Sequence, residues 1–290
     1  MIEFQEAHKG FITHLQDKDS ARSTILAYGK DIQQLLDFVK DELSKTQVQS
    51  IERSDIQGFL DYLEKSGFTP KTISRKINST KTFFRFLKIS EYITDDPATL
   101  ISHPKFETPP PRILTETEYR ALRDAAKGDT RTYAIIEILL QTGIRIGELS
   151  EISLDSFQID EASHGGQLEI ATSRVTLERK IPLNEAVIRA IQEYLKVRPV
   201  VEDRHLLVTR NGKPLAIRNM RAAVKRYLRL AKIEDASVND LRHTWIAHHI
   251  KRGASLILVS RLAGHKRIAT TERYLQYVEP REKKSELAVL

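Results

Sequence analysis

Apolar residues recur every three or four positions through most of the first hundred residues, which is the spacing of amphipathic helices. One helix is predicted over roughly residues 3–15, and three more follow it. Their apolar positions are Leu26, Ile32, Leu35, Leu36 and Val39; Ile56, Phe59, Leu60 and Leu63; and Ile73, Ile77, Phe83, Phe84 and Leu87. The expected N-terminal caps are Ser23-Thr24, Ser54-Asp55 and Thr69-Pro70. This pattern predicts a compact, all-helical domain of four or five helices.

The helical pattern stops at the segment HPKFETPPPRILTETEY, which is rich in proline. Pro104 and the run from Pro109 to Pro111 disfavour a helix and favour an extended, stiff tether. We therefore predict a domain boundary in this segment. The predicted parts are a helical domain over 1–103, a linker over 104–114 and a second domain over 115–290.

The apolar pattern of the second domain indicates helices together with a small sheet. Thr115, followed by Glu118, fits a capping box, and Gly143 ends the strongly apolar helix TYAIIEILLQTG. The segment GQLEIATSRVTLERKIPLN has two apolar runs around a polar break near 172–174, which predicts an antiparallel hairpin. HLLVTRNGKPL is expected to form a short strand with an Asn-Gly turn, whereas NEAVIRAIQEYLKV and the chain after Ile217 are expected to be helical. The predicted fold class is mainly α with a small antiparallel β-sheet.

Composition narrows the class of protein and the kind of partner. The 290 residues are 40% apolar and 29% charged, without a long apolar run or a signal-peptide pattern, so we expect a soluble, cytoplasmic protein. The chain has no cysteine, which excludes disulfides and thiolate metal ligands. Its formal net charge of +7 favours a polyanionic partner.

Two stretches of the chain are basic and contain no acidic residue. Residues 65–88 contain seven Lys or Arg and residues 204–232 contain nine, mixed with apolar residues at helical spacing. We predict that both form helix faces that contact the phosphates of a nucleic acid, although two solvated surfaces would have the same pattern. The candidate contacts are Lys71, Arg75, Lys76, Lys81 and Arg85 in the first stretch, and Arg218, Arg221, Lys225 and Arg229 in the second.

Three segments hold residues suited to chemistry on phosphate. Arg145 follows a helix end in LLQTGIRIGELSEISLDSF, and Glu148 is near enough to orient it; an ordinary surface ion pair is the alternative. Arg242 lies in SVNDLRHTWIAHHI, on a helix with an apolar face, where it either meets a buried partner or faces an anion. The third segment, GHKRIATTERYLQYV, places Tyr274 nine residues after His265.

The same segments do not indicate a metal or nucleotide site. His243, His248 and His249 lack the spacing of a zinc-binding helix, and no glutamate lies between them. Neither of the glycine-rich patterns that bind nucleotide phosphates occurs in the chain. We therefore expect no metal and no cofactor.

In this order and spacing, the three segments resemble the tyrosine recombinases, also called the phage integrase family. TGIRIGELSEISLDSF resembles the first arginine box of the family, DLRHTWIAHHI the second, and LAGHKRIATTERYLQY the box that supplies the nucleophile. STILAYGKDIQQLLDFV, TPKTISRKINSTKTFFRFL and the proline-bearing linker resemble the helical, SAM-like core-binding domain and its tether. The resemblance covers nearly the whole chain and implies two domains that close on duplex DNA as a C-shaped clamp.

The resemblance implies a site-specific recombinase that cleaves and rejoins DNA without ATP or metal. Arg145 and Arg242 would hold the scissile phosphate, and His265 would bond to it or move a proton. Tyr274 would attack the phosphorus to give a 3′-phosphotyrosine, and strand exchange would pass through a Holliday junction. Tyr277, one helical turn later, is expected to pack or to contact DNA.

Two positions depart from the family pattern. Asn239 stands where the second box usually has histidine, and asparagine cannot shuttle a proton. Arg174 stands where the hairpin usually has lysine, eight residues before Pro182, and its high pKa makes it a poor proton donor. Lys180 is the alternative donor if the hairpin register differs. Because the phosphate clamp and the nucleophile are intact, we expect an active enzyme.

The resemblance further implies an assembly of copies on DNA. We expect a recombination site with inverted repeats, a homotetramer associated with the nucleoid, and a C-terminal tail, REKKSELAVL, that docks on the neighbouring copy. Two roles stay open: mobile-element integration, excision or cointegrate resolution, and Xer-like resolution of chromosome or plasmid dimers. The departures at Asn239 and Arg174 favour the first. A DNA-binding regulator without catalysis and a type IB topoisomerase are the alternative functions.

Overall fold

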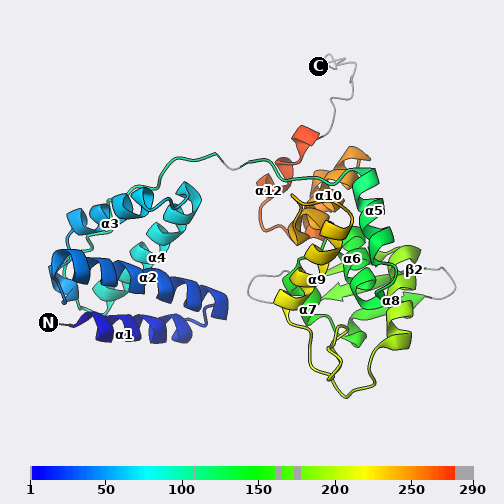
Figure 1. Cartoon of the computed structure of the whole chain (residues 1–290), viewed down its shortest axis with the longest axis horizontal. Helices are drawn as coiled ribbons and strands as arrows, with labels where there is room; N and C mark the ends of the chain where they lie inside the picture. The colour runs from blue at the N-terminus through cyan, green and yellow to red at the C-terminus, as the bar shows by residue number, and fades with distance from the viewer. Residues whose placement is uncertain (1, 108, 161–164, 173–177, 278–290) are drawn as a thin grey trace, which may run out of the picture. The chain divides into compact units, whose positions relative to one another are not determined.

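The chain divides into two compact units, Met1–Thr108 and Pro109–Leu290 (Figure 1). The division falls within the predicted linker. A computed structural model describes residues 2–107, 109–160, 165–172 and 178–277. The prediction of a mainly helical fold with a small antiparallel sheet is confirmed in these residues.

The described part of the N-terminal unit contains four α-helices and one short 3₁₀ helix. They are α1 (Phe4–Asp17), α2 (Arg22–Leu43), η1 (Val48–Ser50), α3 (Arg53–Lys65) and α4 (Pro70–Ile89). α2 packs against α1, α3 and α4, so that the apolar stripes predicted from the sequence meet in one core. Phe11, Phe59 and Phe83 are fully buried in this core. The expected all-helical domain is therefore confirmed.

The N-termini of these helices agree only in part with the predicted caps. Thr69 accepts a hydrogen bond from the amide three residues later and caps α4, as predicted. α2 begins before Ser23-Thr24, so these residues lie inside the first turn and the prediction of a cap there is wrong. At α3 the cap is Glu52 rather than Ser54, because Glu52 and Asp55 together form a reciprocal capping box.

Lys76 is buried within the N-terminal unit, which contradicts its prediction as a DNA contact. Its amino group donates to Asp31 at 2.9 Å and to Gln34 at 2.6 Å, and its side chain is only 6% exposed. Arg75 also pairs with Asp31, but its side chain stays 45% exposed. Lys76 neutralises a carboxylate that α2 buries, so it belongs to the interior of the domain and not to a phosphate-binding face.

The described part of the C-terminal unit contains eight α-helices, two 3₁₀ helices and one sheet. In chain order these are α5 (Glu116–Ala126), α6 (Thr130–Thr142), α7 (Ile146–Glu151), η2 (Leu154–Ser156), β1 (Phe157–Asp160), β2 (Gly165–Ile170), β3 (Arg179–Leu183), α8 (Glu185–Val197), α9 (Ile217–Leu230), α10 (Val238–Lys251), α11 (Leu256–Ala263), α12 (Ala269–Glu272) and η3 (Leu275–Tyr277). None of the helices in the described ranges is long and apolar enough to span a membrane.

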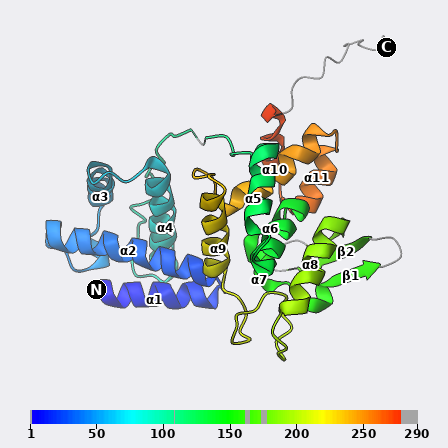
Figure 2. The same ribbon diagram turned by 45° about the vertical axis from the view of Figure 1, so that its right-hand side comes forward.

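The apolar helix α6 forms the centre of this unit. It packs against α5, α8, α9 and α10, and α8 and α9 lie on opposite sides of it (Figures 1 and 2). The capping box of Thr115 and Glu118 begins α5, and Gly143 ends α6, as predicted. The candidate catalytic residues lie in the turn between α6 and α7, in the first half of α10, and in the turns that follow α11 and α12.

The sheet has three antiparallel strands in the order β1-β2-β3. β2 and β3 confirm the predicted hairpin, whereas β1 was not predicted; it pairs with β2 so that Phe157 lies opposite Leu168. The strand predicted at HLLVTRNGKPL is wrong, because in the described residues this segment forms only isolated bridges, such as Val208 with Pro214. Its Asn-Gly turn is present, with φ 75° at Gly212, and residues 206–208 are buried by side-chain packing rather than by a ladder.

Candidate active site

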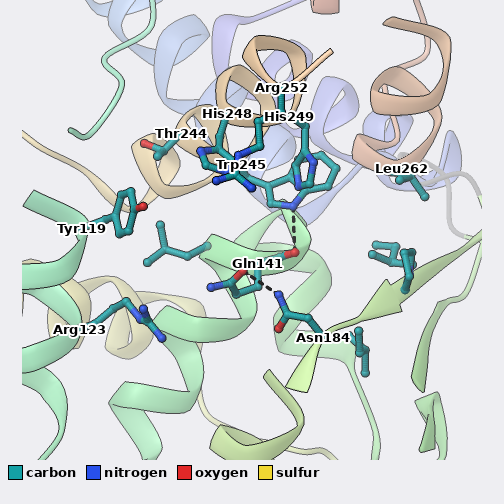
Figure 3. A pocket seen from close by; sticks show the side chains of 14 residues that line it. Tyr119, Arg123, Gln141, Asn184, Thr244, Trp245, His248, His249, Arg252 and Leu262 are labelled. Carbon is teal, nitrogen blue, oxygen red and sulfur yellow. Dashed lines mark hydrogen bonds between the residues drawn. The ribbon is translucent and has the colours of Figure 1, made fainter. Parts of the chain in front are cut away.

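A tight turn at the end of α6 positions the first candidate arginine. Gly143 ends the helix in the left-handed conformation, and the ring of Trp245 covers it so closely that an added Cβ would lie 2.3 Å from the ring. The indole nitrogen of Trp245 donates to the carbonyl oxygen of Gln141 at 2.8 Å (Figure 3). Only glycine fits under this ring, and the turn that follows makes Arg145 the N-cap residue of α7.

Glu148 holds the side chain of Arg145. Its carboxylate accepts from the backbone amide of Arg145 at 2.8 Å and from the guanidinium at 3.0 Å, which confirms the predicted orienting contact. A second guanidinium nitrogen of Arg145 donates to the carbonyl oxygen of Gly264 at 2.9 Å, just before His265. This arginine therefore joins the first and third sequence segments, which lie far apart in the chain.

Arg179 on β3 is a buried member of the site that the sequence analysis did not identify. Its guanidinium donates to both oxygens of Glu148, at 2.8 and 3.2 Å, and to the carbonyl oxygen of Leu262 at 2.7 Å. Burial alone raises the pKa of Glu148, but the hydrogen bonds from Arg179 and Arg145 lower it below its ordinary value, so the carboxylate stays ionised. A signal was present, because Arg179 occupies an inward position in the alternating pattern of its strand.

Arg242 on α10 is buried, and no carboxylate among the described residues pairs with it. One guanidinium nitrogen, Nη1, donates to the carbonyl oxygen of Gly143, whereas Nη2 is buried and lacks a hydrogen-bond partner in the described ranges. Burial, followed by the charge of Arg145, lowers the pKa of Arg242 to about 10, so the side chain is still charged at neutral pH. A buried, charged donor of this kind is suited to an incoming anion.

His265 follows a required glycine at the end of α11. Gly264 has φ 68°, and an added Cβ would lie 2.8 Å from the guanidinium of Arg179. Nδ1 of His265 lies 2.7 Å from the hydroxyl oxygen of Thr271, which is itself buried. Burial and the charges of nearby arginines, Arg242 foremost, lower the pKa of His265 to about 4. The ring is therefore neutral at physiological pH and offers hydrogen bonds rather than charge.

The two tyrosines of the third segment have different surroundings. The side chain of Tyr274 is buried, and its hydroxyl oxygen lies 2.5 Å from Nδ1 of His243. Burial raises the pKa of Tyr274, and the charge of Arg242 opposes that effect only in part. Tyr277 packs against the cluster of buried apolar residues that includes Trp245 and Tyr274, and it donates its hydroxyl hydrogen to the carbonyl oxygen of Pro111. This confirms packing, which was one of its two expected roles.

A cavity of about 620 Å³ opens beside Arg145. Asn239 is exposed and lines it, so this residue of the second segment lies next to the first arginine. Arg221 on α9 and Thr172, at the end of the described part of the hairpin, line the same cavity. The cavity thus brings the arginine site together with one of the predicted DNA contacts.

The lysine position of the family falls in the hairpin. Arg174, the residue predicted there, lies outside the described residues. Lys180, the alternative, is exposed on the opposite face of β3 from the buried Arg179 and does not line the cavity beside the arginine site.

A different cavity, of about 460 Å³, lies beside His248 and His249 (Figure 3), and none of the predicted catalytic residues lines it.

The basic residues predicted to contact DNA are mostly exposed. On α9, Arg218, Arg221, Lys225 and Arg229 are all exposed to solvent. On α4, Lys71, Arg75 and Arg85 are exposed and Lys81 is half-buried. Apart from Lys76, the prediction is therefore compatible with the positions of these side chains.

The assembled site suits chemistry on a phosphodiester. It contains three guanidinium groups, the engaged carboxylate of Glu148 and a buried phenol, all close enough for their charges to shift the pKa of Arg242. In the described part of the chain, no three His, Cys, Asp or Glu side chains come together as a set of metal ligands. The arrangement can stabilise charge on two non-bridging oxygens and supply an oxygen nucleophile.

Known proteins are similar in sequence to this chain over both of its units. The phage integrase family matches residues 112–279, and the phage integrase N-terminal SAM-like domain matches residues 9–90. The tyrosine recombinase XerC of Staphylococcus haemolyticus is 30% identical over 279 residues, which cover 93% of this chain and 92% of the relative. A tyrosine recombinase of Thermosipho africanus is 30% identical over 287 residues, or 94% of this chain and 95% of the relative.

Solved structures share the fold at lower identity. The Tn1549 transposon integrase in complex with a circular intermediate DNA has a TM-score of 0.73 at 20% identity, over 94% of each chain. The XerH site-specific recombinase bound to a palindromic difH substrate has a TM-score of 0.74 at 18% identity, over 90% of this chain and 78% of XerH. These likenesses concern the fold alone. The family match and the relatives, however, show that this chain belongs to the phage integrase family and is a tyrosine recombinase.

Proposed function

We propose that this recombinase cleaves DNA by phosphoryl transfer to Tyr274. The observation that carries the proposal is the buried Nη2 of Arg242, a charged donor that would bind a non-bridging phosphate oxygen. Arg145, whose guanidinium is held by Glu148, supplies a second guanidinium group at the same site. Two arginines alone would suit any bound phosphate, and it is the phenol in the same electrostatic environment that favours covalent chemistry.

In this proposal the oxygen of Tyr274 bonds to phosphorus as the bond to the 5′-oxygen breaks. Arg145 and Arg242 hold the two non-bridging oxygens, whose charge grows in the transition state. Nδ1 of His265 lies 2.7 Å from the hydroxyl oxygen of Thr271. In the tautomer in which Thr271 donates this hydrogen bond, Nε2 carries the hydrogen and donates to the same phosphate. The 3′-phosphotyrosine conserves the bond energy, and a 5′-hydroxyl of a second duplex reseals the strand without ATP, by way of a Holliday junction.

Asn239 and Arg174 complete the phosphate contacts. Asn239 lines the cavity beside Arg145, where its amide donates a hydrogen bond but transfers no proton. Arg174 contributes positive charge from the hairpin and donates a hydrogen bond to the leaving oxygen without giving up its proton. Both substitutions keep a hydrogen-bond donor for the phosphate while removing a side chain that gives up a proton more readily, histidine at 239 and lysine at 174.

The proposed substrate is a duplex recombination site with inverted repeats. The exposed basic residues of α4 in one unit and of α9 in the other contact its phosphates. Four copies assemble on two such sites in the nucleoid. Between the two biological roles, the relatives favour Xer-like dimer resolution, because XerC aligns with this chain over 92% of its own length.

A nicked suicide duplex tests the proposed chemistry. A binding site is first selected from random-sequence DNA, and a nick next to the cleavage position then lets the leaving strand diffuse away, which traps the covalent complex. We expect an adduct with the wild-type protein and with Tyr277→Phe, and none with Tyr274→Phe.

Each other outcome has a defined meaning. Tight binding without any adduct from the wild-type protein would indicate a regulator, and relaxation of plasmids that lack the site would indicate a topoisomerase. An adduct with Tyr274→Phe but not with Tyr277→Phe would reverse the assignment of the nucleophile.

The C-terminal tail is proposed to dock on the neighbouring copy in the tetramer. Its sequence is polar until the last four residues, Leu287, Ala288, Val289 and Leu290, which need an apolar surface to cover them. Deletion of residues 285–290 is expected to weaken cooperative pairing of two sites more than binding to one site. Equal effects on the two measurements would reject a tail that acts between copies.

A further inference from the structure

The hydroxyl group of the candidate nucleophile has one close polar partner in the described structure, and that partner is His243. Nδ1 of His243 lies 2.5 Å from the hydroxyl oxygen of Tyr274, and the two rings lie 5.8 Å apart, tilted by 40°. Tyr274 itself is only 3% exposed. Water therefore has little access to the phenol, and its proton has to leave through a side chain.

Burial makes the removal of this proton difficult. A phenol that is removed from water loses the solvation that its anion needs, which raises the pKa of Tyr274 above its ordinary value. Attack on phosphorus by a neutral phenol leaves a proton on the bridging oxygen that has to be transferred as the O–P bond forms. A neighbouring base is therefore required at hydrogen-bond distance from Tyr274.

The other candidate bases are poorly placed or chemically unsuited. Asn239 is exposed at the cavity beside Arg145 and cannot accept a proton at its amide. Nδ1 of His265 is engaged by Thr271, and three arginines, Arg242 foremost, oppose a positive charge on its ring. Among the described residues, His243 makes a hydrogen bond with the hydroxyl group of Tyr274, whereas Asn239 and His265 do not.

The surroundings of His243 keep it neutral and able to accept. Burial, together with the charges of Arg242 on its own helix and Arg273 beside the nucleophile, lowers its pKa, while Asp240 opposes them. With its hydrogen on Nε2, the neutral ring presents the lone pair of Nδ1 to the phenol. An incoming phosphate adds negative charge near Arg242, which weakens the repulsion of a proton on His243 just when the proton must move.

Resting on the proposed role of Tyr274, we propose that His243 is a catalytic residue that accepts the phenolic proton during strand cleavage. The Oη–H bond breaks and the proton moves to Nδ1 of His243; Oη bonds to phosphorus. The 5′-oxygen leaves with the electron pair of its bond and takes a proton from water. On rejoining, the 5′-hydroxyl loses its proton to water and attacks phosphorus, while protonated His243 returns a proton to the departing Tyr274 oxygen.

Two substitutions separate proton transfer from simple positioning. His243→Ala removes both, whereas the amide oxygen of His243→Gln can still accept the phenolic hydrogen bond but cannot take up the proton. We expect both variants to form the covalent adduct on the nicked duplex about 100-fold or more slowly in a single turnover. His248→Ala, an exposed histidine on the same helix, is the matched control and should react at the wild-type rate.

A duplex with a bridging 5′-phosphorothiolate at the cleavage position identifies which proton is involved. A thiolate leaves without protonation, so this duplex restores the activity of variants that lack an acid for the leaving group. It does not restore variants that lack a base to accept the proton of the attacking tyrosine. We expect the defect of His243→Ala and His243→Gln to persist on it, with DNA binding and the thermal midpoint of unfolding checked for each variant.

The outcomes distinguish a failure of the role proposed for His243 from a failure of the role proposed for Tyr274. Wild-type rates in His243→Gln, or rescue of either variant by the phosphorothiolate, would overturn the role of His243 and leave Tyr274 as the nucleophile. An adduct formed by Tyr274→Phe would instead contradict both proposals, because both require Tyr274 to be the nucleophile. If either variant fails to bind DNA, the rate of the other, correctly folded variant decides the question.

Discussion

At the residue scale, the candidate site holds a charged side chain, that of Arg242, in a buried position where a charge is unfavourable. Arg242 is 8% exposed, its Nη2 has no partner in the described ranges, and its pKa falls to about 10 because it is buried close to Arg145. Such a group destabilises the folded protein at neutral pH, since a charge that loses its hydration gains no carboxylate in return. The phosphate contact proposed for Arg242, rather than stability, would account for an arginine at this position.

Arg242→Gln should therefore be more stable than the wild type and inactive. Glutamine can still donate to the carbonyl oxygen of Gly143 but carries no charge, so we expect the free energy of unfolding to rise by about 1–2 kcal/mol. Urea unfolding followed by the fluorescence of Trp245, the single tryptophan of the chain, measures this value. Arg252→Gln, on an exposed position just after α10, is the control and should change neither stability nor adduct formation.

His265 should make the stability of the C-terminal unit depend on pH. Its pKa is about 4 in the folded protein, below the ordinary 6.5, because of burial and of the nearby arginines. The unfolded chain therefore binds the proton first as the pH falls, and stability decreases between about pH 6.5 and pH 4. In His265→Asn the loss of stability between pH 7.5 and pH 5, measured by urea unfolding, should be smaller. An identical loss in both proteins would contradict the neutral, buried state of this ring.

Sequence reasoning identified residues whose chemistry is visible in a short segment, and it missed those whose role depends on a distant partner. Arg145 and Arg242 follow from the two boxes, and the structure brings them close enough for the charge of Arg145 to lower the pKa of Arg242. Arg179 was missed because its partner Glu148 lies 31 residues earlier in the chain, on α7. His243 was considered only for zinc, because nothing in its own segment shows that the phenol 31 residues later folds back onto it.

At the scale of elements, apolar periodicity was sufficient for long helices and insufficient for short strands. α2 and α4 each span twenty residues or more, so several turns of one stripe define them. β1 has four residues and is held by pairing with β2, which no local pattern records. Residues 206–208 show the opposite case: an apolar run is buried by packing alone and forms no strand.

The turn between α6 and α7 is the element on which the arginine site depends most. Gly143→Ala would place a methyl group 2.3 Å from the ring of Trp245, at a residue with φ 64°. We expect a loss of about 2 kcal/mol or more in the free energy of unfolding. Because the carbonyl oxygen of Gly143 holds Arg242, adduct formation should fall with it.

Gly128→Ala is the matched control for this turn. Gly128 lies near the start of the same helix, and nothing lies within 4 Å of an added Cβ. Its effect on stability should stay within about 0.5 kcal/mol. If Gly143→Ala behaved like this control, the turn and the ring of Trp245 would be able to shift and make room for a methyl group.

At the scale of the whole molecule, charge along the sequence located basic surfaces but not each residue on them. Seven basic residues between 65 and 88 suggested one phosphate-binding face, yet Lys76 is bound by Asp31, which lies 45 residues earlier in the chain. Its carboxylate would otherwise be buried without a counter-charge. Lys76→Ala should therefore act on the folding of the N-terminal unit, whereas Arg85→Ala should act on DNA binding.

The exposed face of α9 gives the last prediction, which concerns the salt dependence of DNA binding. A protein that neutralises phosphates releases counterions, and each contact contributes about 0.9 to the slope of log K against log salt concentration. Lys225→Ala and Arg229→Ala should each lower this slope by about 0.9 without changing the preferred site, because phosphate contacts carry no sequence information.

Lys196→Ala is the control for that measurement. Lys196 is also exposed, but it lies on α8, across α6 from α9, and it pairs with Glu193 at 2.5 Å. Its removal changes the net charge by the same amount and should leave the slope unchanged. Because the control and the α9 variants differ in position and not in charge lost, an equal decrease in all three would mean that net charge, and not the α9 face, determines binding.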